Sequence, residues 1–480
     1  MRRTKIVATV GPATRSAEMM RALIEAGVDV VRLNFAHDAI AQHAAAARTA
    51  REEAAKQGRI VGVLADLPGP KMRTGPISGG FAEISPGDQF TLTSDSVEGD
   101  STRVSTTVDN LAEIVSVGDE MFLADGQVVL RVQSIDGGDV VTEVVRGGTL
   151  RSRKGLHLPS AEARMEAFTP EDQSILQTAV EMEVDLIGLS FIRDGRDVDR
   201  ARAALPPDSI RPQLVAKIET ASAVENLDDI IERMDAVMVA RGDLGIQVPL
   251  RRVPILQKQI IRACNRAGKP VITATEMLES MTDEPLPSRA EATDVANAVF
   301  DGTDALMLSE ETAIGRYPIE AVKTMSEIAE TADVARAAET RRERRSVPEH
   351  GSVHDDDRVA WAAAHAAVEA AQDISAAAIL SVTRSGSTPR RVAAYRPSVP
   401  IGGVSGFIDC LGALALSWGV RPLRVGDHVE ATAIKEEIDR AVSIALESGF
   451  VKPGELVVVV AGSPGPRAGA TDFMRVTRAG

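Results

Sequence analysis

Two short apolar runs end abruptly in charged residues, and these ends hold the residues best suited to chemistry. The run that starts at Leu214 ends in Lys217 and Glu219, and the run that starts at Val237 ends in Asp243. Runs of this kind predict buried parallel strands whose ends lie at one edge of a sheet. Two carboxylates and an ammonium group that meet there can hold a divalent cation together with an anionic substrate. An ordinary ion pair between Lys217 and Glu219 explains the same spacing about equally well.

Basic and amide side chains follow two other apolar runs. Arg32 and Asn34 end one of them, and Lys71 and Arg73 come after the run that ends at Asp66. Arginine suits phosphate because its guanidinium group can donate two parallel hydrogen bonds to it. Each of these charges taken alone is more simply a solvated surface group. The four together predict a phosphate site, provided that their strand ends converge on one face.

Two segments that carry hydroxyl groups are weaker candidates. Thr275 ends the run at 271–274, where its hydroxyl could bind a carboxylate, assist proton transfer or simply cap a helix. A turn that precedes a predicted helix contains Thr383, Arg384, Ser385, Gly386, Ser387 and Thr388. Such a turn can bind phosphate through backbone N–H groups, or it can be a capped turn without a ligand. A second glycine-rich turn at 459–465 slightly favours an effector pocket.

Strands and helices that alternate along the chain must position these side chains. Strands are predicted at 5–10, 28–33, 60–65, 186–189, 214–218, 236–239, 271–274 and 305–308, each followed by a helix. Eight such units are the number that closes a (βα)8 barrel, whose active face gathers the strand ends. Ser16 and Gly27 are expected to cap and end the first helix, and Ser222 and Ser288 are expected to begin capping boxes.

Two regions depart from this alternation. Short alternating runs between about 75 and 155 are separated by Gly and Asp turns, which predicts an antiparallel β insert. After a charged stretch at 341–357, interpreted as a solvated linker, strands at 377–382, 399–404, 421–425 and 456–461 predict a separate open α/β unit. We therefore predict an α/β fold with a TIM barrel at 1–70 and 165–345, an inserted antiparallel β-barrel lid at 71–164, and a C-terminal α/β domain at 350–480.

Composition narrows the classes of partner. The 480 residues carry a net charge of -15, which disfavours nucleic acid or an anionic membrane surface as the main partner. The two cysteines, Cys264 and Cys410, lie far apart, which is typical of a reducing compartment without a disulfide framework. No run reaches the ~18 apolar residues of a membrane span, and the first residues lack the apolar core of a signal peptide. We expect a soluble cytoplasmic protein.

At these residues the sequence resembles the pyruvate kinases, and the resemblance covers nearly the whole chain. The matching motifs are Lys217–Glu219, Met238–Gly245, Thr275–Met281, Asp294–Val299 and Met307–Ala313, together with Arg32, Asn34, Phe35 and His37. The resemblance implies phosphoryl transfer from phosphoenolpyruvate to ADP, giving pyruvate and ATP in the last step of glycolysis. It also implies a mobile lid, a C-terminal domain that often binds a phosphorylated effector, and usually a homotetramer.

The resemblance assigns a role to each matching position. Glu219 and Asp243 would bind Mg²⁺ or Mn²⁺, and Lys217 would stabilise the phosphoryl group in flight and the enolate oxygen left behind. Backbone N–H groups near Gly242 and Asp243, with Thr275, would hold the substrate carboxylate, and Thr275 would support protonation of the enolate carbon. The phosphate and nucleotide side would be lined by Arg32, Arg73, Asn34, His37, Thr9 and Pro12, with Lys154 and Asp125 reaching in from the lid.

Departures from the family pattern bear on the monovalent cation. Members that depend on potassium supply a Ser where this chain has Ala36, a Thr where it has Leu67, and a Glu where it has Lys71. Two oxygen ligands are therefore replaced by apolar side chains, and an ammonium group is added. We expect the Lys71 ammonium, near Asn34 and Asp66, to replace the cation, so that potassium is not required. A plain surface lysine at the lid hinge is the alternative.

Other departures and other readings leave the leading hypothesis in place. Glu276, Glu310 and Asp38 each add negative charge relative to the family pattern, which bears on affinity and regulation more than on chemistry. A carbon–carbon lyase on a related phosphoenolpyruvate/pyruvate barrel would share the paired carboxylates, but not the lysine before the metal-binding Glu, the lid or the C-terminal unit. An inactive sensor of phosphorylated ligands is disfavoured because the catalytic positions are intact.

Overall fold

Eight parallel strands close into a barrel in the computed structural model, which describes residues 2–70, 72–124, 126–159, 166–206, 212–340, 355–426, 434–462 and 471–480. In order around the barrel they are β1 (Lys5–Thr9), β2 (Val30–Asn34), β3 (Gly62–Asp66), β12 (Leu186–Leu189), β13 (Gln213–Ile218), β14 (Ala236–Ala240), β15 (Val271–Ala274) and β16 (Ala305–Leu308). The predicted (βα)8 barrel is confirmed, and β16 closes it by pairing with β1.

The strands of the barrel are buried on both faces, because side chains alternate between its interior and the surrounding helices. Outward-facing residues such as Ile6 and Val31 belong to the core shared with the helices. Inward-facing residues such as Val7, Val30 and Val215 form a second apolar cluster inside the barrel. The near-continuous apolar runs in the sequence are explained by this double burial.

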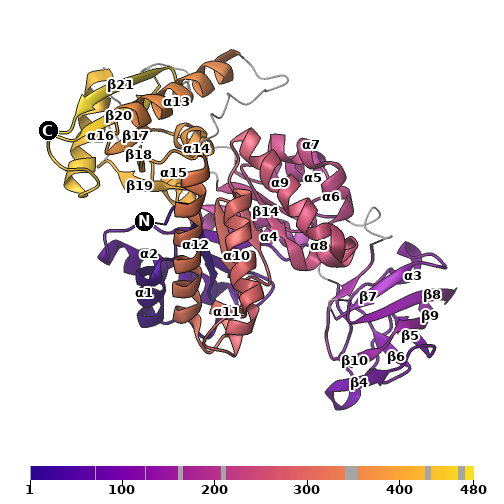
Figure 1. Cartoon of the computed structure of the whole chain (residues 1–480). Helices are drawn as coiled ribbons and strands as arrows, with labels where there is room; N and C mark the ends of the chain where they lie inside the picture. Colours follow the sequence, from indigo (N-terminus) through magenta and orange to yellow (C-terminus); the bar gives the residue numbers. More distant parts are fainter. Residues whose placement is uncertain are drawn as a thin grey trace.

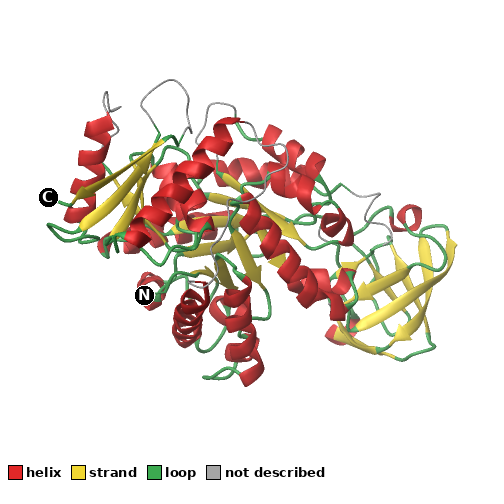
Figure 2. Ribbon diagram, turned by 45° about the horizontal axis from the view of Figure 1, so that its top comes forward, coloured by secondary structure: helices red, strands yellow, loops and turns green. Residues whose placement is uncertain are grey.

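Helices cover the outside of the barrel (Figures 1 and 2). They are α1 (Ala17–Ala26), α2 (Ile40–Lys56), α4 (Pro170–Glu181), α5 (Gly195–Ala203), α6 (Ala221–Glu225), α7 (Leu227–Arg233), α8 (Arg241–Gln247), α9 (Val253–Ala267), α10 (Arg289–Asp301), α11 (Glu310–Ala313) and α12 (Pro318–Thr340). Short 3-10 turns lie at Leu250–Arg252 and Glu279–Thr282. None of the helices in the described ranges combines the length and apolar character needed to cross a membrane.

Helix caps follow the sequence signals with one exception. Ser16 caps α1 and Gly27 ends it, and Ser288 forms a complete capping box with Glu291 at the start of α10. The capping box expected at Ser222 is wrong, because Ser222 lies inside α6. The residue that caps α6 is Thr220, whose hydroxyl accepts a hydrogen bond from the backbone N–H of Ala223 at 3.0 Å.

The insert between β3 and α4 is built of strands, as predicted. It contains a 3-10 turn at Ser78–Gly80, β4 (Phe81–Ile84), β5 (Gln89–Thr93), β6 (Arg103–Ser105), α3 (Leu111–Ile114), β7 (Glu120–Leu123), β8 (Val128–Asp136), β9 (Asp139–Arg146), β10 (Gly148–Arg151) and β11 (Leu156–His157). A two-stranded sheet, β10-β4, and a six-stranded sheet, β11-β7-β8-β9-β5-β6, enclose its own apolar core. Pairing is antiparallel except between β5 and β6. Figure 1 shows the insert at the opposite end of the molecule from the C-terminal unit.

The C-terminal unit is an open, mostly parallel sheet in the order β19-β18-β17-β20-β21. Its elements are α13 (Asp355–Asp373), β17 (Ala378–Val382), α14 (Ser387–Ala394), β18 (Ile401–Ser405), α15 (Ile408–Leu414), β19 (Val420–Arg424), α16 (Ile434–Glu447), β20 (Leu456–Ala461) and the antiparallel β21 (Phe473–Arg478). Residues Ala413, Ala415 and Leu416, at and just after the end of α15, join the apolar cluster inside the barrel. The C-terminal unit therefore closes the end of the barrel that lies away from the carboxyl ends of its strands.

Candidate active site

The side chains at the centre of the site are the top layer of the barrel interior. Along each strand the residue two positions after an inward-facing apolar residue faces inward again. In this way Arg32 follows Val30, and Lys217 follows Val215. Because β2, β3, β12 and β13 are consecutive neighbours in the barrel, Arg32, Asp66 and Lys217 come together at the carboxyl ends of the strands.

Lys217 lies at the centre of this cluster. Its Nζ donates a hydrogen bond to Ser190 Oγ at 2.7 Å, and it lies 2.8 Å from Glu219 Oε1 and 3.2 Å from Asp66 Oδ1. Burial opposes the charged ammonium group, but the two carboxylates outweigh burial and raise the pKa of Lys217 above its ordinary value. The lysine therefore stays positively charged, and the ion pair that the spacing suggested is present as part of a larger cluster.

Arg32 and Asp66 form the second ion pair of the cluster. The Arg32 guanidinium donates to Asp66 Oδ2 at 2.6 Å and to Thr9 Oγ1 at 3.0 Å. Burial works against the Asp66 carboxylate, which is 1% exposed, but Lys217 and Arg32 together lower its pKa below the ordinary value. Asp66 thus holds two cations in place, and its position at the end of β3 sets the separation between them.

Glu219 is fully buried and is fixed by the backbone of a neighbouring loop. Its Oε2 accepts a hydrogen bond from the backbone N–H of Phe191 at 2.6 Å. Burial, with repulsion from Asp243, raises the pKa of Glu219 to about 7, although Lys217 and the Phe191 N–H act in the opposite direction. The cluster holds two cationic side chains, Arg32 and Lys217. Its carboxylates are three, Asp66, Glu219 and Asp243, so negative charge is in excess around Glu219.

The carboxylates of Glu219 and Asp243 fit a divalent cation. Asp243 lies in the first turn of α8, close enough to act on the pKa of both Lys217 and Glu219. Among the described residues, no donor makes a well-aligned hydrogen bond to the buried Glu219 Oε1. The described ranges also contain no cluster of three or more His, Cys, Asp or Glu side chains suited to a metal. Two oxygen donors leave positions for substrate and water, the arrangement in which proteins usually bind Mg²⁺.

Thr275 and Gly242 meet beside this site. The backbone N–H of Gly242 donates to Thr275 Oγ1 at 2.8 Å. Thr275 and Glu276 both have positive φ, 69° and 52°, a conformation that non-glycine residues adopt rarely. Arg241 fixes this turn because its guanidinium donates to Thr275 O at 2.5 Å and Ala274 O at 3.2 Å, and pairs with Asp294 at 2.6 Å. The predicted carboxylate-binding residues are therefore brought together.

The residues expected on the nucleotide side are divided between the barrel and the insert. Thr9 is buried, and its hydroxyl donates to Leu308 O at 2.9 Å. Pro12 and His37 are exposed, and Asn34 Oδ1 accepts from the backbone N–H of Ala36 at 3.2 Å. Arg73 and Lys154 belong to the insert. There the Arg73 guanidinium donates to Arg153 O at 2.9 Å, and Lys154 O accepts from Thr74 N at 2.8 Å. No contact between Arg73 and Arg32 is seen in the described part of the chain.

Two predicted site residues, Lys71 and Asp125, lie outside the described residues. The positions that would supply potassium ligands can be described. Leu67 is buried in the core, and its carbonyl oxygen accepts a hydrogen bond from Ser190 Oγ at 2.7 Å. Ala36 has no side-chain oxygen. Asp66, which was expected near Lys71, is paired with Arg32 and Lys217.

The predicted effector turn lies between β17 and α14, as expected. Gly386 has φ 85° and precedes α14, and its N–H donates to Thr383 Oγ1 at 2.8 Å. Ser385 Oγ and Ser387 Oγ are 3.2 Å apart, and Thr388 Oγ1 bonds Thr471 Oγ1 at 2.7 Å. The Arg384 guanidinium lies over the Phe407 ring, 5.3 Å from its centroid. The last three residues of the second glycine-rich turn, 463–465, lie outside the described residues.

Sequence reasoning missed three residues that organise the site. Ser190 and Phe191 contact Lys217 and Glu219, and Arg241 braces the turn at Thr275. The sequence contains a signal for the first two, because they directly follow the predicted strand at 186–189, and the other strand ends also carry site residues. Arg241 stood within a recognised motif but was given no role.

Comparisons with known proteins agree with this geometry. Residues 1–322 match the family model described as "Pyruvate kinase, barrel domain", and residues 361–477 match the model described as "Pyruvate kinase, alpha/beta domain". A pyruvate kinase of Geobacillus stearothermophilus is 41% identical over 99% of this chain and 80% of its own length. Pyruvate kinases of Thermococcus litoralis and Mycobacterium intracellulare are each 40% identical, over 99% and 100% of this chain and 98% and 99% of their own lengths.

Proposed function

The chain belongs to the pyruvate kinase family, and on that premise we propose that it transfers the phosphoryl group of phosphoenolpyruvate to ADP, giving pyruvate and ATP. The enzyme is a phosphotransferase. The observation that carries the proposal is the buried Lys217 ammonium group, held between Asp66 and Glu219 and next to Asp243. A cation and a pair of carboxylates in one small volume suit a reaction in which negative charge moves between oxygens.

Glu219 and Asp243 are proposed to hold the divalent cation, Mg²⁺ or Mn²⁺. Two observations support this proposal. Glu219 Oε1 is buried without a well-aligned hydrogen bond within the described residues, and the three carboxylates of the cluster outnumber its two cations. When bound, such a cation neutralises charge on the phosphoryl and enolate oxygens. The chain's own residues fix its place, because the Phe191 N–H holds Glu219 Oε2, while Oε1 lies 2.8 Å from Lys217 Nζ and has no well-aligned hydrogen bond within the described residues.

Lys217 and Arg32 are proposed to stabilise the phosphoryl group in transit. Both are charged, both point into the mouth of the barrel, and both are held by Asp66. Gly242, Asp243 and Thr275 are proposed to bind the substrate carboxylate, since the Thr275 hydroxyl and the Gly242 N–H already lie together at the start of α8. Thr275 also supports protonation of the enolate carbon. ADP is proposed to bind between Pro12, Asn34 and His37 of the barrel and Arg73 and Lys154 of the insert.

Pyruvate formation from phosphoenolpyruvate, ADP and Mg²⁺ tests this function directly. A carbon–carbon lyase or an inactive sensor would release no pyruvate in step with ATP. Replacing Lys217 with Met should lower kcat by at least about 10³-fold, because the removed charge acts mainly in the transition state. The variant should keep its far-UV circular dichroism. Turnover like that of the wild type in the folded variant would remove Lys217 from its role.

Activity without potassium is the second part of the proposal. Its support is the absence of side-chain oxygens at two positions, since Leu67 is packed into the core and residue 36 is an alanine. Lys71 would supply the missing charge. Initial rates in a tetramethylammonium buffer should equal those with added potassium, and a strong stimulation by potassium would refute the idea. The variant that combines Ala36→Ser, Leu67→Thr and Lys71→Glu should become responsive to potassium.

Regulation, assembly and location complete the proposal. A phosphorylated metabolite is proposed to bind at 383–388, supported by Arg384 and the hydroxyl groups around the start of α14. Candidates to screen as activators are AMP, ribose 5-phosphate, glucose 6-phosphate and a sugar bisphosphate. A homotetramer in the cytoplasm and the division of the chain at 71–164 and 350–480 are also proposed. Light scattering of the purified protein tests the assembly.

A further inference from the structure

Phe191 adopts a backbone conformation that costs energy. Its φ is 55°, in the left-handed region that bulky residues avoid. Such a conformation is unfavourable for a bulky residue and persists only where the surroundings impose it. The residue follows β12 by two positions, at the carboxyl end of the barrel. Its strained backbone therefore lies beside Lys217 and Glu219.

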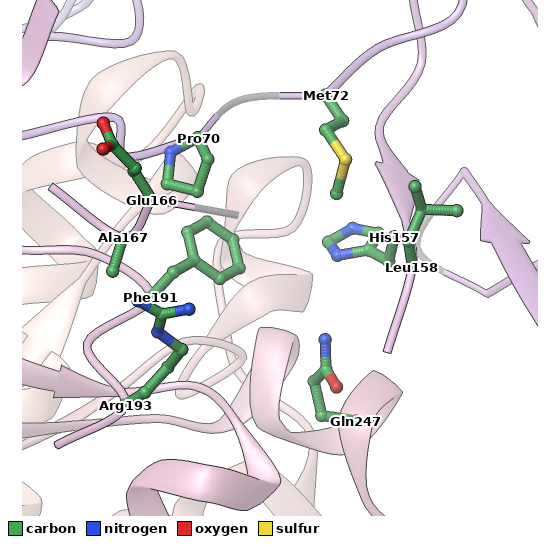
Figure 3. Close-up of a pocket in the computed structure, with 9 residues that line it drawn as sticks. All are labelled: Pro70, Met72, His157, Leu158, Glu166, Ala167, Phe191, Arg193 and Gln247. Carbon is green, nitrogen blue, oxygen red and sulfur yellow. The ribbon is translucent and has the colours of Figure 1, made fainter. Parts of the chain in front are cut away.

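The two ends of Phe191 contact two different parts of the molecule. Its backbone N–H donates to Glu219 Oε2 at 2.6 Å. Its ring points into a pocket between the barrel and the insert (Figure 3), where Pro70 lies on one side and Met72 and His157 lie across the gap. Pro70 and Met72 lie in the described part (67–70 and 72–77) of the stretch that leads from β3 into the insert, and Leu158 lies in the described part (158–159) of the stretch that leads back to the barrel. We call these stretches the hinge.

Phe191 and Ser190 also press against the first stretch of the hinge. A Cβ added at Gly69, where φ is +65°, would lie 3.0 Å from Phe191 Cδ2 and 2.9 Å from Ser190 Cβ. Ser190 donates to Leu67 O at 2.7 Å while it accepts from Lys217 Nζ. Two adjacent residues therefore touch the hinge on one side and hold both Lys217 and Glu219 on the other.

The pocket around the Phe191 ring is small and lies where the insert joins the barrel. Its volume is about 30 Å³. Its walls are mostly apolar, with Phe191, Pro70, Met72 and Leu158 among them.

We propose that Phe191 is a positioning residue that fixes Glu219 for the divalent cation and makes that position depend on the hinge of the insert. The ring, seated at the hinge, holds the backbone at positive φ. That conformation aims the N–H at Glu219 Oε2, so that Oε1 faces the cation. The inference rests on the proposed role of Glu219 and adds to it a route by which a domain movement alters metal binding.

Direct binding of Mn²⁺ tests the first half, with free Mn²⁺ followed by electron paramagnetic resonance in the absence of substrates. Phe191→Ala should weaken Mn²⁺ binding about 10-fold, the lower end of the effect of groups that orient metal ligands. Phe191→Gly should bind Mn²⁺ more tightly than Phe191→Ala, because glycine adopts φ near 55° without cost. Phe191→Tyr keeps the ring and should bind like the wild type.

Two results would overturn this half. One is unchanged Mn²⁺ affinity in Phe191→Ala, and the other is a glycine variant that binds no better than the alanine variant. Phe191→Leu serves as the milder change if the alanine variant does not fold. Failure of the proposed function is distinguishable, because the wild-type protein would then neither bind Mn²⁺ tightly nor form pyruvate.

A double-mutant cycle with Met72 tests the link to the hinge. Met72 lines the same pocket from the insert side, across the gap from Phe191 (Figure 3). Met72→Ala should weaken Mn²⁺ binding two- to five-fold in the wild-type background and have no further effect in Phe191→Ala, because coupled residues are not additive. Additive effects, or no effect of Met72→Ala in either background, would overturn the link to the hinge.

Discussion

The polar side chains around Lys217 satisfy one another only in part. Asp66 Oδ1 and Glu219 Oε1 lie within 3.2 and 2.8 Å of Nζ. Neither has a well-aligned hydrogen bond within the described residues. Incomplete pairing of buried charge costs stability, and it is the condition that a site needs if it is to receive a cation and a phosphorylated substrate. At the residue scale, sequence spacing suggested the pair Lys217–Glu219 but not the contacts of Lys217 with Asp66 and Ser190.

Ser190 provides a prediction at this scale. Ser190→Ala removes the hydroxyl oxygen, just after β12, that accepts a hydrogen bond from Lys217 Nζ. The lysine then keeps only its contacts with the two carboxylates. We expect kcat to fall about 10-fold, since one hydrogen bond to a charged group is worth about 1.5 kcal/mol, with little change in the melting temperature. Steady-state kinetics and a thermal melt measure both effects. Ser222→Ala, on α6 away from this contact, is the control, and equal kcat in the two variants would contradict the role.

Positive φ at Phe191, Thr275 and Glu276 could not be predicted from sequence. Each residue type ordinarily prefers negative φ, and the observed values are imposed by contacts from other strands. In Thr275 the constraint is Arg241, which reaches across from the end of β14. Local sequence preferences carry no information about such constraints. The expected roles of Thr275 came from its position and from the family resemblance and not from its conformation, and Phe191 was missed altogether.

At the scale of elements, apolar runs predicted the strands well and their ends less well. The strands at 186–189, 271–274 and 305–308 are as predicted, because these runs are buried on both faces and bounded by polar residues. β21 was missed because most of its residues are exposed and the segment lacks an apolar run. The Ser222 error has a similar cause, since two hydroxyl residues compete to cap α6 and only Thr220 stands where the chain enters the helix.

Helix caps give a matched pair of predictions. Ser288→Ala should lower the free energy of unfolding by about 1 kcal/mol, because the Ser288 hydroxyl accepts from the Glu291 N–H at the start of α10. Ser222→Ala should leave it within about 0.5 kcal/mol of the wild type, because Ser222 caps nothing. Urea titrations of the two variants measure the difference. A larger loss in Ser222→Ala would contradict the assignment of caps.

Asp29 gives a prediction that depends on pH. It joins β1 and the start of β2, because its Oδ2 accepts from Ile6 N at 3.0 Å and pairs with Arg2 at 2.9 Å. Burial disfavours its charge, but Arg2, Lys5 and Arg59 outweigh burial and lower the pKa of Asp29 below its ordinary value.

A carboxyl group whose pKa is lowered on folding stabilises the fold above its unfolded pKa, about 3.9, and loses that contribution as the pH falls through its folded pKa. Asp29→Asn should therefore cost about 3 kcal/mol at pH 7, and the difference from the wild type should shrink steadily below pH 4. Thermal melts of both proteins across this range measure it. A difference that stays constant down to pH 2 would contradict the explanation.

At the scale of the whole molecule, the barrel and the C-terminal unit are joined by buried charge. Arg396 pairs with Asp304 at 3.0 Å and also donates to Gly302 O at 2.7 Å. The Trp418 backbone N–H donates to Asp304 Oδ1 at 3.2 Å, and its indole N–H donates to Asp333 Oδ1 at 3.2 Å. These contacts link the start of β16 and α12 to the C-terminal unit. None of them was predicted from sequence, because they join residues far apart in the chain.

Arg396→Met tests this junction. The change leaves Asp304 buried without its charge partner, so we expect a loss of about 3–5 kcal/mol. The loss should appear as earlier melting and as faster proteolysis between the barrel and the C-terminal unit. Arg421→Met is the control, because Arg421 lies over the Phe450 ring within the C-terminal unit and crosses no junction. Equal proteolysis of both variants would show that the Arg396 pair does not hold the two parts together.

One end of the barrel is closed by the C-terminal unit, and this has a consequence while the chain is being synthesised. Ala413, Ala415 and Leu416 complete the apolar cluster inside the barrel. Its other members come from the barrel strands, the last of which ends at Leu308. During synthesis, every strand of the barrel therefore leaves the ribosome well before these three residues do. Until that last piece emerges, the nascent barrel holds an uncovered apolar opening, and this interval is when the growing chain has most need of a chaperone.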